Sequence, residues 1–164
     1  MIIPKTFHKN LDLIFTVDSL NFLRDAVEFW RPYCLTVIQR LGYVCKSWTG
    51  KISKHQLKHS DILTVVEDLA KGGDINDDHK FFSYEHFYVI YCKFYELDVA
   101  KRNSLSLAEL SRYSEDSGIN QKVFDRVYLL RRYQTAESFD YRDFVWFILS
   151  EEDKVLSFFL QSIN

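Results

Sequence analysis

Asp98 and Glu109 occupy the first and last positions of a twelve-residue stretch, the spacing of the terminal carboxylate ligands in a calcium-binding loop. Such loops bind calcium through hard oxygen atoms at positions 1, 3, 5, 7, 9 and 12. Ser104 falls at position 7, but Ala100 and Arg102 stand at positions 3 and 5, so a ligand is lost and a cation is introduced. We therefore expect a vestigial calcium loop at Asp98, Ser104 and Glu109, with no metal or only weakly bound calcium.

A six-residue pattern occurs four times along the chain, and it indicates which elements surround this loop. In each copy an apolar residue precedes Ser or Asp, and three residues later a polar residue precedes another apolar one. This is typical of the second half of an EF-hand, in which a short strand leads into the exiting helix. The pattern predicts an all-α fold of EF-hand-like helix-loop-helix units in two pairs, with short strands pairing between loops. The copies span residues 52–57, 82–87, 105–110 and 139–144.

The repeat can specify helix starts without any metal ion. Ser53 with Gln56, and Ser106 with Glu109, have the spacing of capping boxes, in which each partner bonds to the other's backbone amide. Asn103 tolerates the positive φ that position 6 requires. We therefore expect the loop geometry to persist where calcium binding is lost.

The pattern defines four loops, and three of them lack most calcium ligands. Loop 1 has no carboxylate, although Gly50 suits its turn, and loop 2 has Ile75 and His86 at its first and last positions. Loop 4 has Arg132 and Ala136 at positions 1 and 5. No cofactor is expected in these three loops. Loops 1 to 4 span residues 45–56, 75–86, 98–109 and 132–143.

Apolar spacing predicts the flanking helices. A helix that begins near Ser19 is expected to end at Pro32, because proline disfavours helix in the residue before it. A second helix, 33–44, then enters loop 1, and one helix leaves loop 2 and enters loop 3. The expected division is a lead-in of uncertain structure at 1–18, a first degenerate EF-hand pair with its preceding helix at 19–97, a second degenerate pair at 98–154 and a divergent tail at 155–164.

Composition excludes several classes of protein. The 164 residues are 47% hydrophobic and 16% aromatic, which predicts a folded chain. The net charge of −2 lacks the basic footprint of a nucleic-acid binder. No long apolar run predicts a membrane span or signal peptide. Three widely spaced cysteines indicate reduced thiols, so we expect an intracellular protein, cytoplasmic or nuclear.

Residue patterns give no support to an enzyme. His55 and His59 have the spacing of a shared metal site, but Gln56 stands where a metalloprotease needs its general base. Cys92 lies among aromatic residues, where a buried, inert thiol is expected. No glycine-rich phosphate loop or nucleophile elbow occurs.

Two longer segments of the sequence resemble a known protein family. FSYEHFYVIYCKFYELD at 82–98 and YRDFVWFILSEEDK at 141–154 closely resemble the B'' family of regulatory subunits of serine/threonine protein phosphatase type 2A. A weaker similarity runs through residues 20–51, so the resemblance covers about residues 19–154. It implies a non-catalytic subunit that binds the phosphatase scaffold and catalytic subunits, directs the choice of phosphoprotein substrates, and assembles under the influence of calcium.

The chain departs from that family at Ala100 and Arg102, where the family's loop carries acidic residues. We also expect a central fragment, truncated form or reduced relative, without the family's further C-terminal hand and N-terminal scaffold-binding segment. Acidic Glu151, Glu152 and Asp153 are candidate partner contacts. Two alternatives remain: a free calmodulin-like calcium sensor that binds target peptides, and a truncated structural EF-like protein that does not bind the phosphatase.

Overall fold

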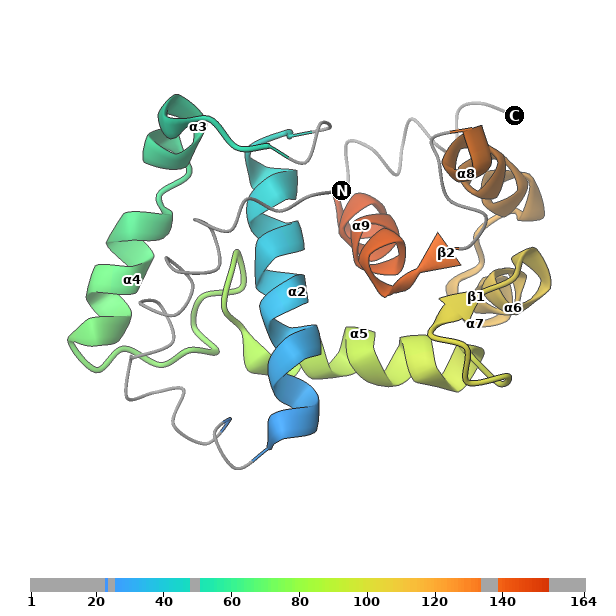
Figure 1. The fold of residues 1–164 in the computed structure, drawn as a ribbon, viewed down its shortest axis with the longest axis horizontal. Helices are drawn as coiled ribbons and strands as arrows, with labels where there is room; N and C mark the ends of the chain where they lie inside the picture. Colours follow the sequence, from blue (N-terminus) through green and yellow to red (C-terminus); the bar gives the residue numbers. More distant parts are fainter. Residues whose placement is uncertain (1–22, 24–25, 48–50, 134–138, 154–164) are drawn as a thin grey trace. The chain divides into compact units, whose positions relative to one another are not determined.

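The computed structural model describes residue 23 and residues 26–47, 51–133 and 139–153 (Figure 1). The expected lead-in 1–18 and tail 155–164 lie outside the described residues, as do Gly50 and Ala136. The chain divides into two compact units, Met1–Tyr88 (unit 1) and Val89–Asn164 (unit 2). The expected pair ranges, 19–97 and 98–154, stay predictions.

Helix α2 (Val27–Val44) includes Pro32, so the expectation of two helices meeting at this proline is wrong. A proline inside a helix removes a backbone donor and costs roughly 3 kcal/mol. Burial outweighs that cost, because Tyr33, Val37 and Leu41 are all buried on α2, and each such side chain contributes about 1.5–3 kcal/mol.

Within the described residues of unit 1, two short helices follow α2 and precede α5 along the chain. Helix α3 (Lys54–His59) begins at Ser53, and Ser53 and Gln56 form the expected capping box. Helix α4 (Ile62–Ala70) follows Asp61, which adopts a left-handed conformation with φ 61°. Since α3 buries none of its residues, local capping specifies where it begins.

Helix α5 (Tyr84–Leu97) is continuous and contains the boundary between the two units, and it leaves loop 2 and enters loop 3 as expected (Figure 1). It begins after Ser83, whose Oγ accepts the amide of His86 at 3.2 Å. Its apolar residues are buried at helical spacing: Phe87, Ile90, Phe94 and Leu97.

Unit 2 contains the expected pairing between loops. The residues at position 8 of loops 3 and 4, Leu105 and Phe139, face each other in an antiparallel bridge of two short strands. Phe94, Phe124 and Phe144 belong to the core beside this bridge. Along the chain after α5, unit 2 comprises β1 (Ser104–Leu105), α6 (Leu107–Ser111), α7 (Tyr113–Ser117), α8 (Gln121–Tyr133), β2 (Phe139–Asp140) and α9 (Tyr141–Glu152).

The four expected helix starts are all present. Ser53, Ser106 and Asp140 each form a capping box, and the Ser83 hydroxyl caps α5. These caps specify the helix starts locally, and the apolar faces of the helices form the cores.

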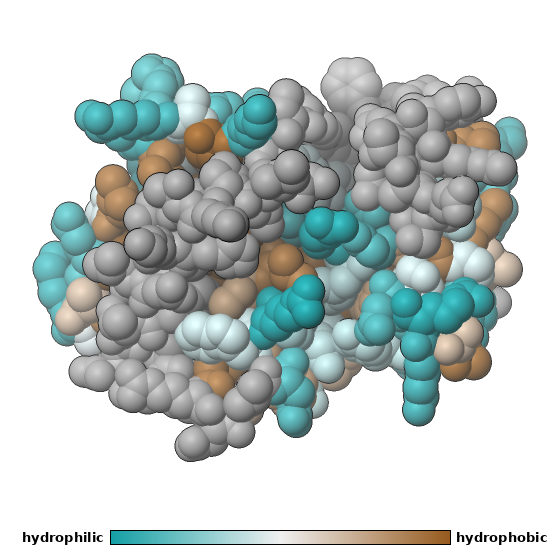
Figure 2. Space-filling model, viewed as in Figure 1, coloured by the Kyte–Doolittle hydropathy of each residue, from teal (hydrophilic) through white to brown (hydrophobic). Residues whose placement is uncertain are grey.

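Hydrophilic and hydrophobic side chains are interspersed over the described part of the face in Figure 2.

Candidate functional site

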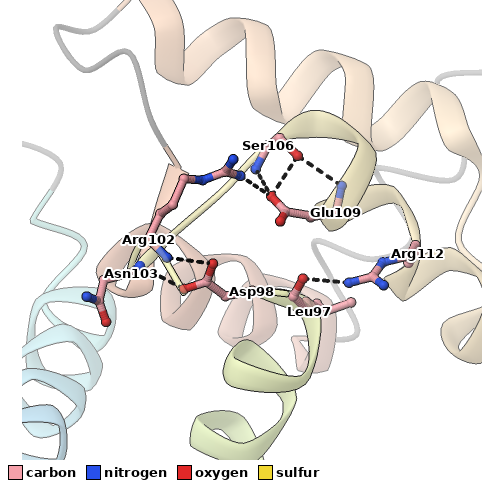
Figure 3. Close-up of polar contacts among 7 residues, drawn as sticks. All are labelled: Leu97, Asp98, Arg102, Asn103, Ser106, Glu109 and Arg112. Carbon is pink, nitrogen blue, oxygen red and sulfur yellow. Dashed lines mark hydrogen bonds and ion pairs between the residues drawn. The ribbon is translucent and has the colours of Figure 1, made fainter. Parts of the chain in front are cut away.

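Loop 3 begins at Asp98, directly after α5, and the Asp98 carboxylate organises its first half (Figure 3). Asp98 is 1% exposed, and its backbone amide donates to the carbonyl of Phe94 at 2.9 Å. One carboxylate oxygen accepts the amide of Arg102 at 3.0 Å, and the other accepts the amide of Asn103 at 2.7 Å. A buried carboxylate needs such donors, so the first position of the loop is satisfied by the loop's own backbone.

The turn of loop 3 uses left-handed backbone at two residues. Lys101 has φ 51° and Asn103, at position 6, has φ 56°, which confirms the conformation expected for Asn103. The Tyr95 hydroxyl donates to Asn103 Oδ1 at 3.2 Å. The helix that enters the loop therefore also anchors its turn.

The last position of loop 3, Glu109, is held by three donors on one carboxylate oxygen. Its Oε2 accepts the Ser106 amide at 2.8 Å and the Ser106 hydroxyl at 2.7 Å. Arg102 Nη2 also donates to Oε2, at 2.5 Å (Figure 3). The Ser106 amide, the Ser106 hydroxyl and then the Arg102 guanidinium lower the pKa of Glu109, because all three favour the ionised carboxylate.

The exit from loop 3 is fixed to neighbouring elements. Ser104 is half-buried in β1 opposite Asp140. Arg112 Nη2 donates to the carbonyl of Leu97 at 2.5 Å, which links the end of α6 to the end of α5 (Figure 3). These contacts connect the helices that enter and leave the loop.

The residues of loop 3 do not fit a calcium ion. Ala100 offers no side-chain oxygen at position 3, and Arg102 at position 5 directs its cation to Glu109, the carboxylate that would bind calcium in a bidentate manner. Within the described ranges, no group of three or more His, Cys, Asp or Glu side chains is arranged to hold a metal ion.

Loop 2 is held from α2 by two buried side chains that the sequence analysis missed. The Tyr33 hydroxyl donates to the carbonyl of Phe82 at 2.6 Å. Arg40, 1% exposed, donates through Nη1 to the carbonyls of Phe81 at 2.9 Å and Ser83 at 3.1 Å. Three consecutive carbonyls of the loop are therefore bound by one helix.

The amides of the same segment are bound as well, which explains why Phe82 lies outside any strand. Asp78 Oδ2 accepts the amide of Phe81 at 2.9 Å and that of Phe82 at 2.8 Å. A bridge at position 8 needs the amide and carbonyl of that residue, and in Phe82 both are engaged by side chains. The signal that could have revealed this arrangement is a polar Arg40 on the apolar face of α2.

The side chain at the last position of loop 2 is also engaged. Arg40 Nη2 lies 2.8 Å from His86 Nδ1, so this nitrogen is the acceptor in a hydrogen bond from the guanidinium. In loop 1, the last residue, Gln56, donates through Nε2 to the carbonyl of Cys45, the first residue, at 2.9 Å. The final side chain of each of these loops thus bonds to a protein group.

Asp74, Asn76 and Asp78 alternate like calcium ligands, in a frame that begins one residue before loop 2. Each side chain instead accepts backbone amides. Asp74 Oδ1 accepts that of Asn76 at 2.8 Å, and Asn76 Oδ1 accepts that of Tyr84 at 3.0 Å. These residues therefore build the turn that precedes α5.

The candidate contact residues lie at the end of α9. Glu151 is half-buried and accepts a hydrogen bond from the Tyr113 hydroxyl at 2.7 Å. Glu152 is exposed, and Asp153 is the C-cap of the helix. The structure thus gives Glu151 an intramolecular partner and presents Glu152 to solvent, and partner contact by these residues stays a prediction.

Three further side chains with possible chemistry, His55, His59 and Cys92, are exposed. His55 and His59 stack with ring centroids 4.1 Å apart, and His59 Nδ1 lies 2.9 Å from the carbonyl of His55. Cys92 is exposed, so the expectation of a buried thiol is wrong. Spacing alone could not decide which face of α5 carries Cys92.

The fold and its loops are those of EF-hand-like helix-loop-helix units, and a model of the EF-hand domain matches residues 1–72. The chain is 44% identical over 149 residues to the alpha form of the B'' regulatory subunits of serine/threonine-protein phosphatase 2A, from Homo sapiens. It is 43% identical over 149 residues to the delta form from Mus musculus. Each match covers 87% of this chain. The chain is thus homologous to the B'' regulatory subunits over most of its own length, and the resemblance seen at 82–98 and 141–154 is confirmed.

A solved structure of a PP2A PR70 holoenzyme, designated diCa, contains a chain similar in fold. The TM-score is 0.78 and the identity 43%, and the match covers 90% of this chain and 55% of that chain. The chain spans only 13% of the alpha form and 30% of the delta form. Within the described residues, no helix is both long and apolar enough to cross a membrane.

Proposed function

We propose that this chain is a non-catalytic regulatory subunit of protein phosphatase 2A that directs holoenzyme assembly and the choice of phosphoprotein substrates. The observation that carries the proposal is the identity of 43–44% over 87% of the chain with proteins named as B'' regulatory subunits of this phosphatase. The proposed partners are the scaffold and catalytic subunits and phosphoprotein substrates.

The proposed mechanism is contact between folded surfaces. The helix-loop-helix units are fixed internally by caps, by the β1–β2 bridge and by the contacts of Arg40 with loop 2. Preformed surfaces of this kind bind without the entropic cost of ordering a flexible segment. One surface would dock on the holoenzyme and another would face the substrate, with the acidic end of α9, including Glu152, as a proposed contact.

Calcium is proposed to play little or no part in this contact. Calcium affinity follows the charge and number of oxygen ligands, and loop 3 has Ala100 and Arg102 at two ligand positions. The alternative of a free calcium sensor needs an ion-driven opening, which the paired Arg102 and Glu109 disfavour.

A pull-down with purified components tests the proposal. The full chain is the bait, the phosphatase scaffold and catalytic subunits are the prey, and binding is compared with calcium and with chelator. Equal capture in both conditions is the expected result. Failure of capture in both conditions would refute the proposed function, and capture only with calcium would refute the proposed independence of the ion.

A charge reversal tests the contact at α9. Glu152→Lys is expected to weaken capture several-fold, because a rim charge affects association with a charged partner. Glu85→Lys is the matched control, since Glu85 is also an exposed helical glutamate but lies in the first turn of α5. Equal effects of the two variants would argue against a contact at Glu152.

A further inference from the structure

Loop 3 contains both a pair of carboxylates, at its first and last positions, and a cationic side chain between them. Asp98 and Glu109 keep the first and last positions, and Arg102 reaches from position 5 to the Glu109 carboxylate at 2.5 Å. The Arg102 side chain is 51% exposed and that of Glu109 is 14% exposed. The ion pair therefore lies at the surface of loop 3, and the Glu109 carboxylate is mostly shielded from water.

We infer that Arg102 is the built-in cation of loop 3, and that its guanidinium replaces calcium in holding the loop in its capped, strand-paired conformation. In a calcium-bound hand, the ion links the start of the loop to the carboxylate at position 12 on the exiting helix. The Arg102 guanidinium makes the corresponding link to Glu109, and the Arg102 amide bonds to Asp98. One residue thus joins both end carboxylates.

The hydrogen bonds of the two end carboxylates support this role. Two carboxylates that face a loop without an ion would repel each other and lack donors. Asp98 is instead satisfied by the amides of Arg102 and Asn103, and Glu109 by Arg102 and Ser106. The two end carboxylates consequently require no external cation.

The other described loops use the same principle with different partners. The last residue of loop 1, Gln56, bonds to the carbonyl of Cys45, and the last residue of loop 2, His86, accepts a hydrogen bond from Arg40. An internal partner at position 12 is thus present in loops 1, 2 and 3. Arg102 would hold loop 3 in this way whether or not the chain binds the phosphatase.

Thermal unfolding of the full chain tests whether the Arg102 cation matters. Arg102→Gln is expected to lower Tm by about 2–4 °C, as removal of a partly exposed ion pair does in a chain of this size. Arg102→Lys should recover part of the loss, and higher salt should reduce it. Lys101→Gln is the matched control, because it makes the same charge change at the adjacent exposed residue. Equal Tm values for Arg102→Gln and Lys101→Gln would overturn the inference.

Restoring calcium ligands tests whether the cation replaces the ion. The double variant A100D/R102D places carboxylates at positions 1, 3, 5 and 12, so it should have a lower Tm in chelator and gain about 5 °C or more in about 1 mM calcium. The unmodified chain should show the same Tm in both solutions. Calcium stabilisation of the unmodified chain, or a double variant that is as stable as the unmodified chain in chelator, would refute the replacement.

Discussion

Loop 2 in unit 1 and loop 3 in unit 2 begin from the same pattern, yet their backbones are held by different means. In loop 2, Tyr33 and Arg40 bind the carbonyls of the segment that leads into α5, and Asp78 binds its amides. In loop 3, Leu105 joins β1 to β2 through a backbone bridge. An EF-hand-like loop can therefore be fixed either by side chains from an earlier helix or by a partner loop.

The arginine side chains that hold loops 2 and 3 also differ in burial. Arg40 is 1% exposed, whereas the Arg102 side chain at the mouth of loop 3 is 51% exposed. Hydrogen bonds to a buried charge are costly to remove, because the groups left behind lose contact with water. The stability of unit 1 should therefore depend more on Arg40 than the stability of unit 2 depends on Arg102.

The largest effect is expected from Arg40→Met, which keeps an unbranched apolar stem and removes the guanidinium with its donors. The buried carbonyl of Phe81 then loses its donor, and that of Ser83 keeps only the amide of Phe87. The free energy of unfolding should therefore fall by about 3 kcal/mol or more. Urea unfolding measures the loss. Arg31→Met, at an exposed position of the same helix, is the control. Similar losses for both variants would show that the buried hydrogen bonds contribute little.

Leu105→Ala should be the next most damaging change and should act in unit 2. Leu105 is buried in the bridge beside the core, and a Leu-to-Ala change at such a site costs about 3 kcal/mol through lost burial and a cavity. Hydrogen exchange should accelerate at β1 and β2. Leu129→Ala, at an exposed position of α8, should cost far less, and equal costs would contradict the assigned core.

A pair of tyrosine variants compares single hydrogen bonds in the two loops. Tyr33→Phe removes the buried bond to the Phe82 carbonyl and should cost about 1–2 kcal/mol, while Tyr95→Phe removes the exposed bond to Asn103 and should cost a few tenths of a kcal/mol. Denaturant midpoints of the two variants measure the difference. A larger loss for Tyr95→Phe would reverse the proposed order.

The smallest effect is expected from the pH dependence of Glu109. Its pKa is lowered in the folded chain, so the unfolded state binds more protons at acidic pH, and stability falls as the pH drops through the folded pKa. The stabilisation is fully present above the usual glutamate value of about 4.3. Glu109→Gln should flatten the stability profile in that acidic window, and an unchanged profile would contradict the contribution of this carboxylate.

Local features of the sequence predicted much of the fold. The capping boxes at Ser53 and Ser106 are present, and the frame of loops 3 and 4 is confirmed because their position-8 residues, Leu105 and Phe139, pair. These features could be predicted because capping and strand position depend on residues only a few places apart.

Features that depend on distant contacts were missed. Pro32 suggested a helix end, but the burial of Tyr33 and its neighbours keeps α2 continuous. Cys92 was expected to be buried and is exposed. The contacts of Arg40 with loop 2 join residues more than forty positions apart, and such a separation leaves no short-range signal in one sequence.

The sequence by itself determined the helix starts, the all-α class, the positions of the loops and the loss of calcium ligands at Ala100 and Arg102. These properties follow from residue type and short-range spacing, through capping geometry and ligand chemistry. Only the tertiary structure decided that Arg102 bonds to Glu109, that Arg40 holds loop 2 and that loops 3 and 4 form a bridge. Those choices depend on which groups are brought together away from water, because most buried donors and acceptors must find partners there.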